Sequence, residues 1–145
     1  MNKVELSFRH RIAPRLAPFL LLSWHEDGAV CPGVPDASYV MRQPGYETGW
    51  LELKAVASRL TGTKSAAFKI EPSQHQWISQ RHHLVPVHFL LEVEHHAYLV
   101  SGRHHERLDE KLDMMTLRGL SCADGPSLDA GSWLTTALKD NTRRT

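Results

Sequence analysis

Apolar residues recur at helical spacing in the first part of the chain. Over residues 3–22 they stand every three or four positions, which is typical of a helix with one buried face. Pro14 and Pro18 interrupt this stretch, and a proline inside a helix removes one hydrogen bond and clashes with the preceding turn. The pattern therefore predicts either two short helices or one bent helix.

The polar and apolar positions that follow predict three strands. Residues 23–30 are a candidate for the first strand, and residues 37–42 form a second extended run. Residues 50–56 alternate apolar and polar side chains with a period of two, which is typical of a strand with one buried face. A proline–glycine pair between the last two runs favours a turn. Residues 36–56 are therefore predicted to form a hairpin.

A loop, a helix and a second hairpin are predicted next. Residues 58–70 are polar and irregular, so we expect a mobile loop there. Pro72 suits the first turn of a helix that ends near His83. Residues 85–93 and 97–100 are apolar runs separated by a short polar turn, which predicts the second hairpin.

The C-terminal part, residues 102–145, is predicted to be a helical tail. Short helices are expected over residues 104–117 and 129–138. The predicted order is therefore αβββαββ followed by that tail, which is an α/β fold with a mixed sheet flanked by helices. The length of 145 residues suits a single domain, residues 1–145, with its core over about residues 3–101.

Composition excludes several classes of protein. Hydrophobic residues make up 41% of the chain and charged residues 23%, which is a globular rather than a disordered composition. The net charge of +1 excludes a polybasic, histone-like chain. The apolar run at residues 19–22 is too short to cross a membrane, and two cysteines suit a reducing compartment. We therefore expect a cytoplasmic protein with no membrane partner.

Three short motifs carry the candidate chemistry, and each falls on a different predicted element. Gly33-Val34-Pro35-Asp36 enters the second strand, Glu52-Leu53-Lys54 lies on the third, and Gln74-His75-Gln76-Trp77 opens the following helix. In type and order they resemble the PD-(D/E)XK nuclease superfamily, and within it the virus-type replication-repair nuclease group (VRR-NUC), which is common in phages. The resemblance covers about residues 3–101. It implies a restriction-endonuclease-like core similar to that of Holliday-junction resolvases.

The spacing of these residues suits a site for a hard metal ion. Glu52 and Lys54 are two positions apart on a strand, so their side chains point to one face. Leu53 points the other way, into the core, while its backbone carbonyl can still face the site. Asp36 lies on the neighbouring strand of the hairpin. Two carboxylates and a carbonyl make an all-oxygen set, which suits Mg²⁺ or Mn²⁺ rather than zinc.

The chemistry that the resemblance implies for this set is hydrolysis of a phosphodiester bond in DNA. A metal ion held by Asp36, Glu52 and the Leu53 carbonyl can polarise the phosphate and lower the pKa of a bound water. Lys54 can hold or activate that water and offset charge in the transition state. Gln74, at a helix N-terminus, can orient the lysine, the water or the phosphate.

A further acidic ligand is expected, because the superfamily often places a glutamate on its first helix. Glu5 is the candidate on the predicted first helix, and Glu26, on the predicted first strand, is its competitor. Each also has a simpler interpretation, as a charge at a helix N-terminus for Glu5 and as part of a polar turn for Glu26. The sequence leaves the choice between them open.

Basic residues flank the candidate site although the total charge is nearly neutral. They predict contacts with a DNA backbone, because lysine and arginine neutralise phosphates; ordinary scatter of surface charge is the alternative. Acidic residues gather instead over residues 106–113, which we expect on a distant face. The candidates for DNA binding are Arg9, Arg11, Lys64, Lys69 and Arg81.

The histidines and tryptophans favour structural roles. No cysteine or histidine spacing matches a zinc module, so we expect exposed histidines in turns and at helix ends. His75 and His82 are the exceptions, because they lie on the helix of Gln74 and can meet phosphate. Trp77 and Trp50 are expected to pack against the sheet.

Two functions from different classes follow. The first is a metal-dependent DNA endonuclease that acts on branched or flapped DNA, and the second is a catalytically silent DNA-binding or interaction module on the same fold. A hydrolase acting on RNA or nucleotides is a third interpretation. Cutting a four-way junction needs two active sites, so that substrate implies a homodimer. The candidate interface is formed by Trp133, Leu134 and Leu138.

Overall fold

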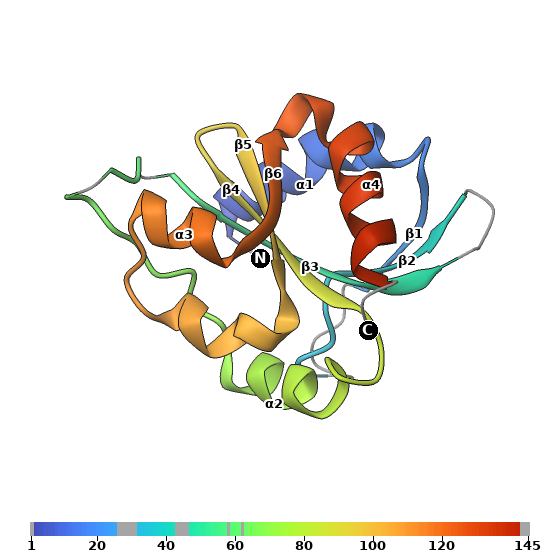
Figure 1. Ribbon diagram of the computed structural model, residues 1–145, viewed down its shortest axis with the longest axis horizontal. Coiled ribbons are helices and arrows are strands. Elements are labelled where there is room, and N and C mark those ends of the chain that lie inside the picture. The colour runs from blue at the N-terminus through green and yellow to red at the C-terminus, as the bar shows by residue number, and fades with distance from the viewer. Residues whose placement is uncertain (1, 26–31, 43–46, 58, 62, 143–145) are drawn as a thin grey trace.

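The computed structural model describes residues 2–25, 32–42, 47–57, 59–61 and 63–142. In this part of the chain six strands form one sheet, and helices lie around it (Figure 1). The elements are α1 (Lys3–Leu16), β1 (Leu20–Trp24), β2 (Ala37–Met41), β3 (Thr48–Val56), α2 (Pro72–Arg81), β4 (Val87–Val93), β5 (His96–Ser101), the 3-10 helix η1 (Gly102–Asp109), α3 (Met114–Leu120), β6 (Ser121–Pro126), the 3-10 helix η2 (Ser127–Asp129) and α4 (Ala130–Thr142).

The strands lie in the sheet in their chain order, from β1 at one edge to β6 at the other. β3 and β4 run parallel, because α2 carries the chain back between them, and every other neighbouring pair is antiparallel. The sheet is therefore mixed. The predicted α/β class and the two predicted hairpins, β2–β3 and β4–β5, are confirmed.

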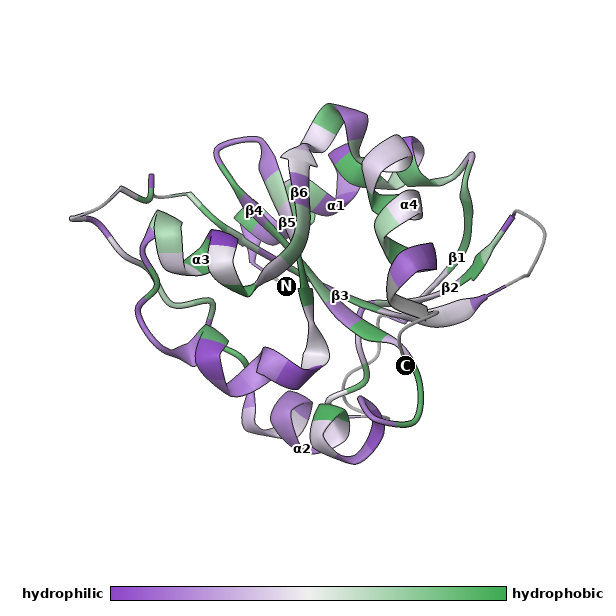
Figure 2. Cartoon of the chain, in the orientation of Figure 1, coloured by the Kyte–Doolittle hydropathy of each residue, from purple (hydrophilic) through white to green (hydrophobic). Residues whose placement is uncertain are grey.

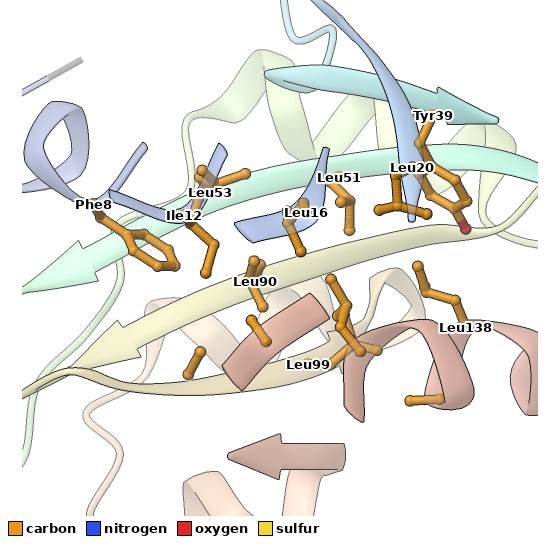
Figure 3. Close-up of a cluster of buried hydrophobic side chains, with 14 of the residues drawn as sticks. Phe8, Ile12, Leu16, Leu20, Tyr39, Leu51, Leu53, Leu90, Leu99 and Leu138 are labelled. Atoms are coloured by element: carbon orange, nitrogen blue, oxygen red, sulfur yellow. The ribbon is translucent and has the colours of Figure 1, made fainter. Parts of the chain in front are cut away.

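Helices cover both faces of this sheet. α1 and α4 pack on one face, where Phe8 and Ile12 lie in one apolar cluster with Leu138 (Figure 3). α2, η1 and α3 cover the other face, where Trp77 and Leu108 belong to a second cluster. Burial of these apolar side chains is the main force that holds the layers together. None of the described helices has the length and apolar character needed to cross a bilayer.

The central strands are more hydrophobic than the outer helices, as expected when helices cover both faces of a sheet. Every residue of β4 is buried, as expected for a strand covered on both faces. In Figure 2 the ribbon of β4 is largely hydrophobic, whereas that of η1 is largely hydrophilic. Since the sheet is covered on both sides, a polar side chain on its central strands costs free energy unless it has a partner or lines a pocket.

The N-terminal segment is one helix followed directly by a strand. α1 runs through Pro14 and ends at Leu16, so of the two predicted alternatives the chain forms a single helix and not two short ones. Pro14 lies in the last turn, where its ring removes the hydrogen bond to the carbonyl four residues earlier, and the helix ends two residues later. β1 begins at Leu20, so residues 20–22 belong to a strand and not to the predicted helix. Residues 26–30 of the predicted first strand lie outside the described residues.

The tail contains a strand that the sequence pattern did not indicate. β6 pairs antiparallel with β5 and completes the sheet. Its sequence contains a glycine, ends in a proline and shows no alternation of apolar and polar residues, although exposure alternates along the strand. The helix predicted over residues 104–117 is divided into η1 and α3. A purely helical tail is therefore wrong.

The apolar residues of α4 are part of the core. Leu134 and Leu138 are 0% exposed and pack in the cluster shared with α1. Trp133 is partly buried, and its indole N–H donates a hydrogen bond of 3.2 Å to the Pro126 carbonyl. Leu134 and Leu138 are therefore core residues of the protomer and not surface residues of the predicted interface, whereas the homodimer itself stays a prediction.

The segment before α2 is irregular, as predicted, but it is anchored. Leu60, Phe68 and Ile70 are buried in the cluster beneath α2 and η1. Ala66 exchanges two backbone hydrogen bonds with Leu112. These contacts tie the segment to the body of the protein, which its polar composition did not indicate.

Candidate functional site

A pocket of about 640 Å³ opens where the first turns of α1 and α2 approach the β2–β3 hairpin. It receives side chains from segments that are far apart in the sequence. Polar side chains predominate on its wall, which is unusual for a cavity beside a sheet and indicates a site for a polar or charged ligand. The polar residues that line it include Glu5, Asp36, Glu52, Lys54, Lys69 and Gln74.

Alternation along β3 places Glu52 and Lys54 in this pocket. Leu51 and Leu53 point to the opposite face and are buried against α1. Glu52 and Lys54 therefore face the α2 side, since successive side chains of a strand alternate between the two faces. Lys54 Nζ lies 3.6 Å from Glu52 Oε1, and both side chains are at most 10% exposed.

Asp36 is joined to Glu52 by the register of the hairpin. Ala37 pairs with Leu51, so Asp36 stands across from Glu52 on the neighbouring strand. The backbone N–H of Asp36 donates to Glu52 Oε2 at 3.0 Å, and the backbone N–H of Leu53 donates to Asp36 Oδ2 at 2.7 Å. Each carboxylate thus caps the backbone of the other strand, which fixes both in the pocket.

Gln74 completes this group from α2. Its amide nitrogen donates to Glu52 Oε1 at 2.5 Å. Its amide oxygen accepts from the backbone N–H of Glu71 at 3.0 Å, as part of a capping box at the helix N-terminus. The cap fixes which end of the amide faces Glu52. Gln74 therefore positions the carboxylate while it closes the first turn of α2.

The loop before Asp36 packs closely on the same helix end. Gly33 has φ +85°, a conformation that favours glycine. A Cβ at this position would lie 2.1 Å from the Ser73 carbonyl oxygen. Only glycine lets the loop approach α2 this closely, which explains the glycine that opens the Gly33–Asp36 motif.

Burial sets the electrostatics of the two carboxylates. Burial first, and then the negative charge of Asp36, raise the pKa of Glu52 to about 8, although Lys54 opposes the change. Burial also raises the pKa of Asp36, against a hydrogen bond from the Leu53 N–H and the charge of Lys54. The pair therefore retains a proton near neutral pH, and a divalent cation is the kind of charge that would replace it.

The donor set fits a cation that needs few protein ligands. Within the described residues there is no group of three or more His, Cys, Asp or Glu side chains placed to hold a metal ion. Asp36 and Glu52 form a pair rather than a closed cage. Mg²⁺ commonly binds through one or two carboxylates and keeps several waters, so the pair suits Mg²⁺ better than Zn²⁺ or Ca²⁺.

Of the two candidates for a further acidic ligand, the structure describes only Glu5. Glu5 lines the pocket from the first turn of α1, and its charge is one of the causes that raise the pKa of Asp36. Glu26 lies outside the described residues. The Leu53 side chain is buried in the core, as expected, whereas a role for its carbonyl oxygen stays a prediction.

The predicted DNA-binding residues gather only in part at the pocket, where the charge of Arg9 opposes the rise in the pKa of Asp36. Of the five, Lys69 lines the pocket, with a backbone φ of 51°, and Lys64 is exposed. The Arg9 guanidinium lies 4.2 Å from the centre of the Trp24 ring. Arg11 forms hydrogen bonds of 2.6 and 2.8 Å with the buried carboxylate of Glu92. Contacts of these residues with DNA stay predictions, and Arg11 has a clear structural partner instead.

A histidine cluster between α2 and η1 was missed from the sequence. His75 Nδ1 lies 2.6 Å from His105 Nδ1, and the other ring nitrogen of His75 contacts the Asp109 carboxylate. Asp109 also accepts a hydrogen bond of 2.7 Å from the Ile70 N–H. His105 is buried, so the expectation of exposed histidines is wrong there. The exposed Asp109 contacts His75 of α2, so this one residue of the acidic run does not lie on a distant face. No local spacing indicates contacts across 30 residues or more.

Comparisons with family models, with curated proteins and with solved structures found no match to this chain. The chemistry of the pocket must therefore be argued from the residues that line it.

Proposed function

We propose that the protein is a metal-dependent DNA endonuclease that hydrolyses phosphodiester bonds and is selective for branched or flapped DNA. The observation that carries this proposal is the convergence of Asp36, Glu52 and Lys54 in one pocket. Two buried carboxylates with a lysine beside them supply both halves of such chemistry, a place for a cation and a fixed positive charge.

The resemblance to the PD-(D/E)XK superfamily supports the same proposal. The first seven strands and α-helices follow the order α1, β1, β2, β3, α2, β4, β5, which is the order predicted from the sequence pattern of the core that the resemblance covers. Its three motifs fall at the start of β2, on β3 and in the first turn of α2, around one pocket. We therefore assign the core to the restriction-endonuclease-like fold and the chain to the VRR-NUC type.

In the proposed reaction each residue has a distinct task. Asp36 and Glu52 hold Mg²⁺ or Mn²⁺, which supplies Lewis acidity toward the phosphate and a more acidic water. Lys54 holds the attacking water in line and offsets negative charge as it develops on the phosphate. Gln74 keeps Glu52 oriented through the 2.5 Å hydrogen bond. Glu5 is the candidate for an additional ligand, directly or through water.

A catalytically silent DNA-binding module on the same fold is the second candidate. One observation favours it: among the described side chains the acidic ligands form a pair and not a group of three. A nuclease can operate with such a pair because substrate phosphate and water fill the remaining positions of the ion. The two candidates therefore differ in whether the pocket turns over substrate.

The experiment that separates them is a cleavage assay on a panel of DNA substrates. Linear, flapped and four-way DNA are incubated with the protein and Mg²⁺, and the products are resolved on a denaturing gel. Discrete cuts near the branch point, abolished by chelation and by Asp36→Asn, support the nuclease. Asp140→Asn is the matched control, because Asp140 is exposed on α4, which packs on the other face of the sheet. Binding of these substrates without any cuts supports the silent module.

A further inference from the structure

A row of rings lies next to the carboxylate pocket on the same face of the sheet. Trp50 precedes Glu52 by two positions on β3, so its side chain points to the same face. The Trp77 ring of α2 meets Trp50 edge to face, with centres 5.1 Å apart and planes at 69°. The His25 ring lies over Trp50 with centres 5.3 Å apart and planes at 36°.

His25 is held in that place by the strands that carry the carboxylates. Its backbone N–H donates to the Asp36 carbonyl oxygen at 2.8 Å. Its ring nitrogen Nε2 lies 3.1 Å from the Ser38 hydroxyl, and Ser38 pairs with Trp50 across the hairpin. The ring is therefore fixed over Trp50, two residue pairs along the hairpin from Asp36 and Glu52.

The inner and outer ends of the row differ in exposure. Trp77 is 9% exposed and belongs to the core beneath α2, with the Arg81 guanidinium 4.5 Å from its ring centre. Trp50 is half-buried and His25 is exposed. The buried end makes the row rigid, while the outer end offers ring surface to a ligand.

The spacing matches the geometry of a nucleotide. Residues two apart on a strand are separated by about 7 Å, so Trp50 lies about that far along β3 from Glu52. A phosphate at the carboxylates would place its own or the adjacent base over the His25–Trp50 end of the row. A base can use such a surface only when it is outside a duplex stack, as in single strands, flaps and junction arms.

We propose that His25 and Trp50 form a stacking subsite for one unpaired base of the DNA strand whose phosphate enters the carboxylate pocket. The ligand is thus a strand with at least one unstacked nucleotide beside the bound phosphate, and fully paired DNA does not use the subsite. This inference rests on the proposed function, because the position of the base is set by a DNA phosphate bound at the carboxylates. Base recognition here comes from ring overlap and is therefore tolerant of sequence.

The test measures binding in chelator, so that it does not depend on a metal ion or on cleavage. Dissociation constants are determined by fluorescence anisotropy for labelled oligothymidine and for a blunt duplex of equal length. His25→Ala should weaken binding of the single strand about fivefold or more, because stacking on an aromatic ring contributes ~1–3 kcal/mol per base. Duplex binding should not change, and His25→Phe should restore the affinity for the single strand. His10→Ala, an exposed histidine of α1, is the matched control.

A second measurement reports on Trp50 without relying on affinity. Addition of the single strand should quench tryptophan fluorescence, and Trp50→Phe should remove most of that quenching while it keeps a ring in place. The subsite is overturned if His25→Ala binds the single strand with wild-type affinity, or if it loses single-strand and duplex binding equally. If the protein cuts no DNA but still prefers the single strand in a way that depends on His25, the stacking subsite is supported and the nuclease function is excluded. If the protein cuts DNA but its affinity for the single strand does not depend on His25, the nuclease function is supported and the stacking subsite is excluded.

Discussion

The backbone N–H of Asp36 donates a hydrogen bond of 3.0 Å to Glu52 Oε2. The two acidic residues are therefore coupled mechanically as well as electrostatically, since the Asp36 carboxylate in turn accepts from the Leu53 N–H at 2.7 Å. The same contacts that keep the strands in register hold both carboxylates in the pocket. A substitution at either position should be judged by its effect on charge separately from its effect on these bonds.

Asp36→Asn changes the charge and leaves the hydrogen bond to Leu53 possible, because an amide oxygen also accepts. We expect DNA cleavage to fall to background, since a hard cation binds a neutral amide poorly compared with a carboxylate. DNA affinity in chelator should be kept or rise slightly, because one negative charge near the phosphate is gone. Anisotropy and gel assays on the same preparation check both results, and normal cleavage by this variant would exclude the metal site.

The pKa of Glu52 makes stability depend on pH in a definite direction. With its pKa raised from 4.5 to about 8, the native state holds a proton that the unfolded state releases between these values. The metal-free protein should therefore lose stability as pH rises from 4.5 to 8, by a few kcal/mol at most.

Urea unfolding at several pH values, in chelator, measures this slope, and Glu52→Gln should flatten it. His88 acts in the opposite direction at lower pH, because burial lowers its pKa to about 4 and stability is lost as pH falls from 6.5. The interval between pH 6.5 and 8 therefore separates the coupled Asp36–Glu52 pair from His88. A wild-type slope there that is unchanged by Glu52→Gln would show that the carboxylate is already ionised in the native state.

Much of this arrangement follows from local patterns. The alternation along residues 50–56 indicated which face of β3 carries Glu52 and Lys54, and the proline at the start of α2 indicated where Gln74 lies. A strand has only two faces and a helix begins at a capped turn, so local spacing is sufficient for these features. The resemblance then linked three local motifs to one site.

The remainder depends on contacts between distant segments. The sequence of β6 shows no alternation of apolar and polar residues, and backbone hydrogen bonds to β5 hold this edge strand in the sheet. The His75–His105 contact joins α2 to η1 across the fold, and the ion pair of Arg11 with Glu92 joins α1 to β4. Arg11 was predicted to bind DNA because it is basic and near the site in sequence. Charge alone does not distinguish a phosphate contact from a buried partner.

Lys54→Ala separates catalysis from metal binding. The lysine is placed 3.6 Å from Glu52 Oε1 but supplies no ligand, so both carboxylates should still bind Mn²⁺ in its absence. We expect cleavage to fall about 10²–10³-fold, the usual cost of removing one group that stabilises transition-state charge. Single-turnover cleavage rates, with Mn²⁺ binding followed by electron paramagnetic resonance, check the two effects. Loss of Mn²⁺ binding in this variant would assign the lysine a structural role instead.

Gly33→Ala tests the packing of the loop on α2. The added Cβ would meet the Ser73 carbonyl oxygen at 2.1 Å, and φ is +85°, so we expect a loss of stability of about 1–3 kcal/mol and reduced cleavage. Gly119→Ala is the matched control: no atom lies within 4 Å of its added Cβ, and the change should stabilise α3 by about 0.5–1 kcal/mol. Thermal unfolding compares the two variants. Equal effects would mean that the close approach of Gly33 to α2 is unimportant.

The proposed function requires that Asp36 and Glu52 bind one divalent cation together. The position of that cation can be observed directly. Crystals soaked in MnCl₂ give an anomalous difference map in which manganese is identified by position. We expect one strong peak between the Asp36 and Glu52 carboxylates, beside Lys54, and no such peak in crystals of Asp36→Asn. Manganese bound only elsewhere, with no peak at these carboxylates, would show that the pocket is not a metal site.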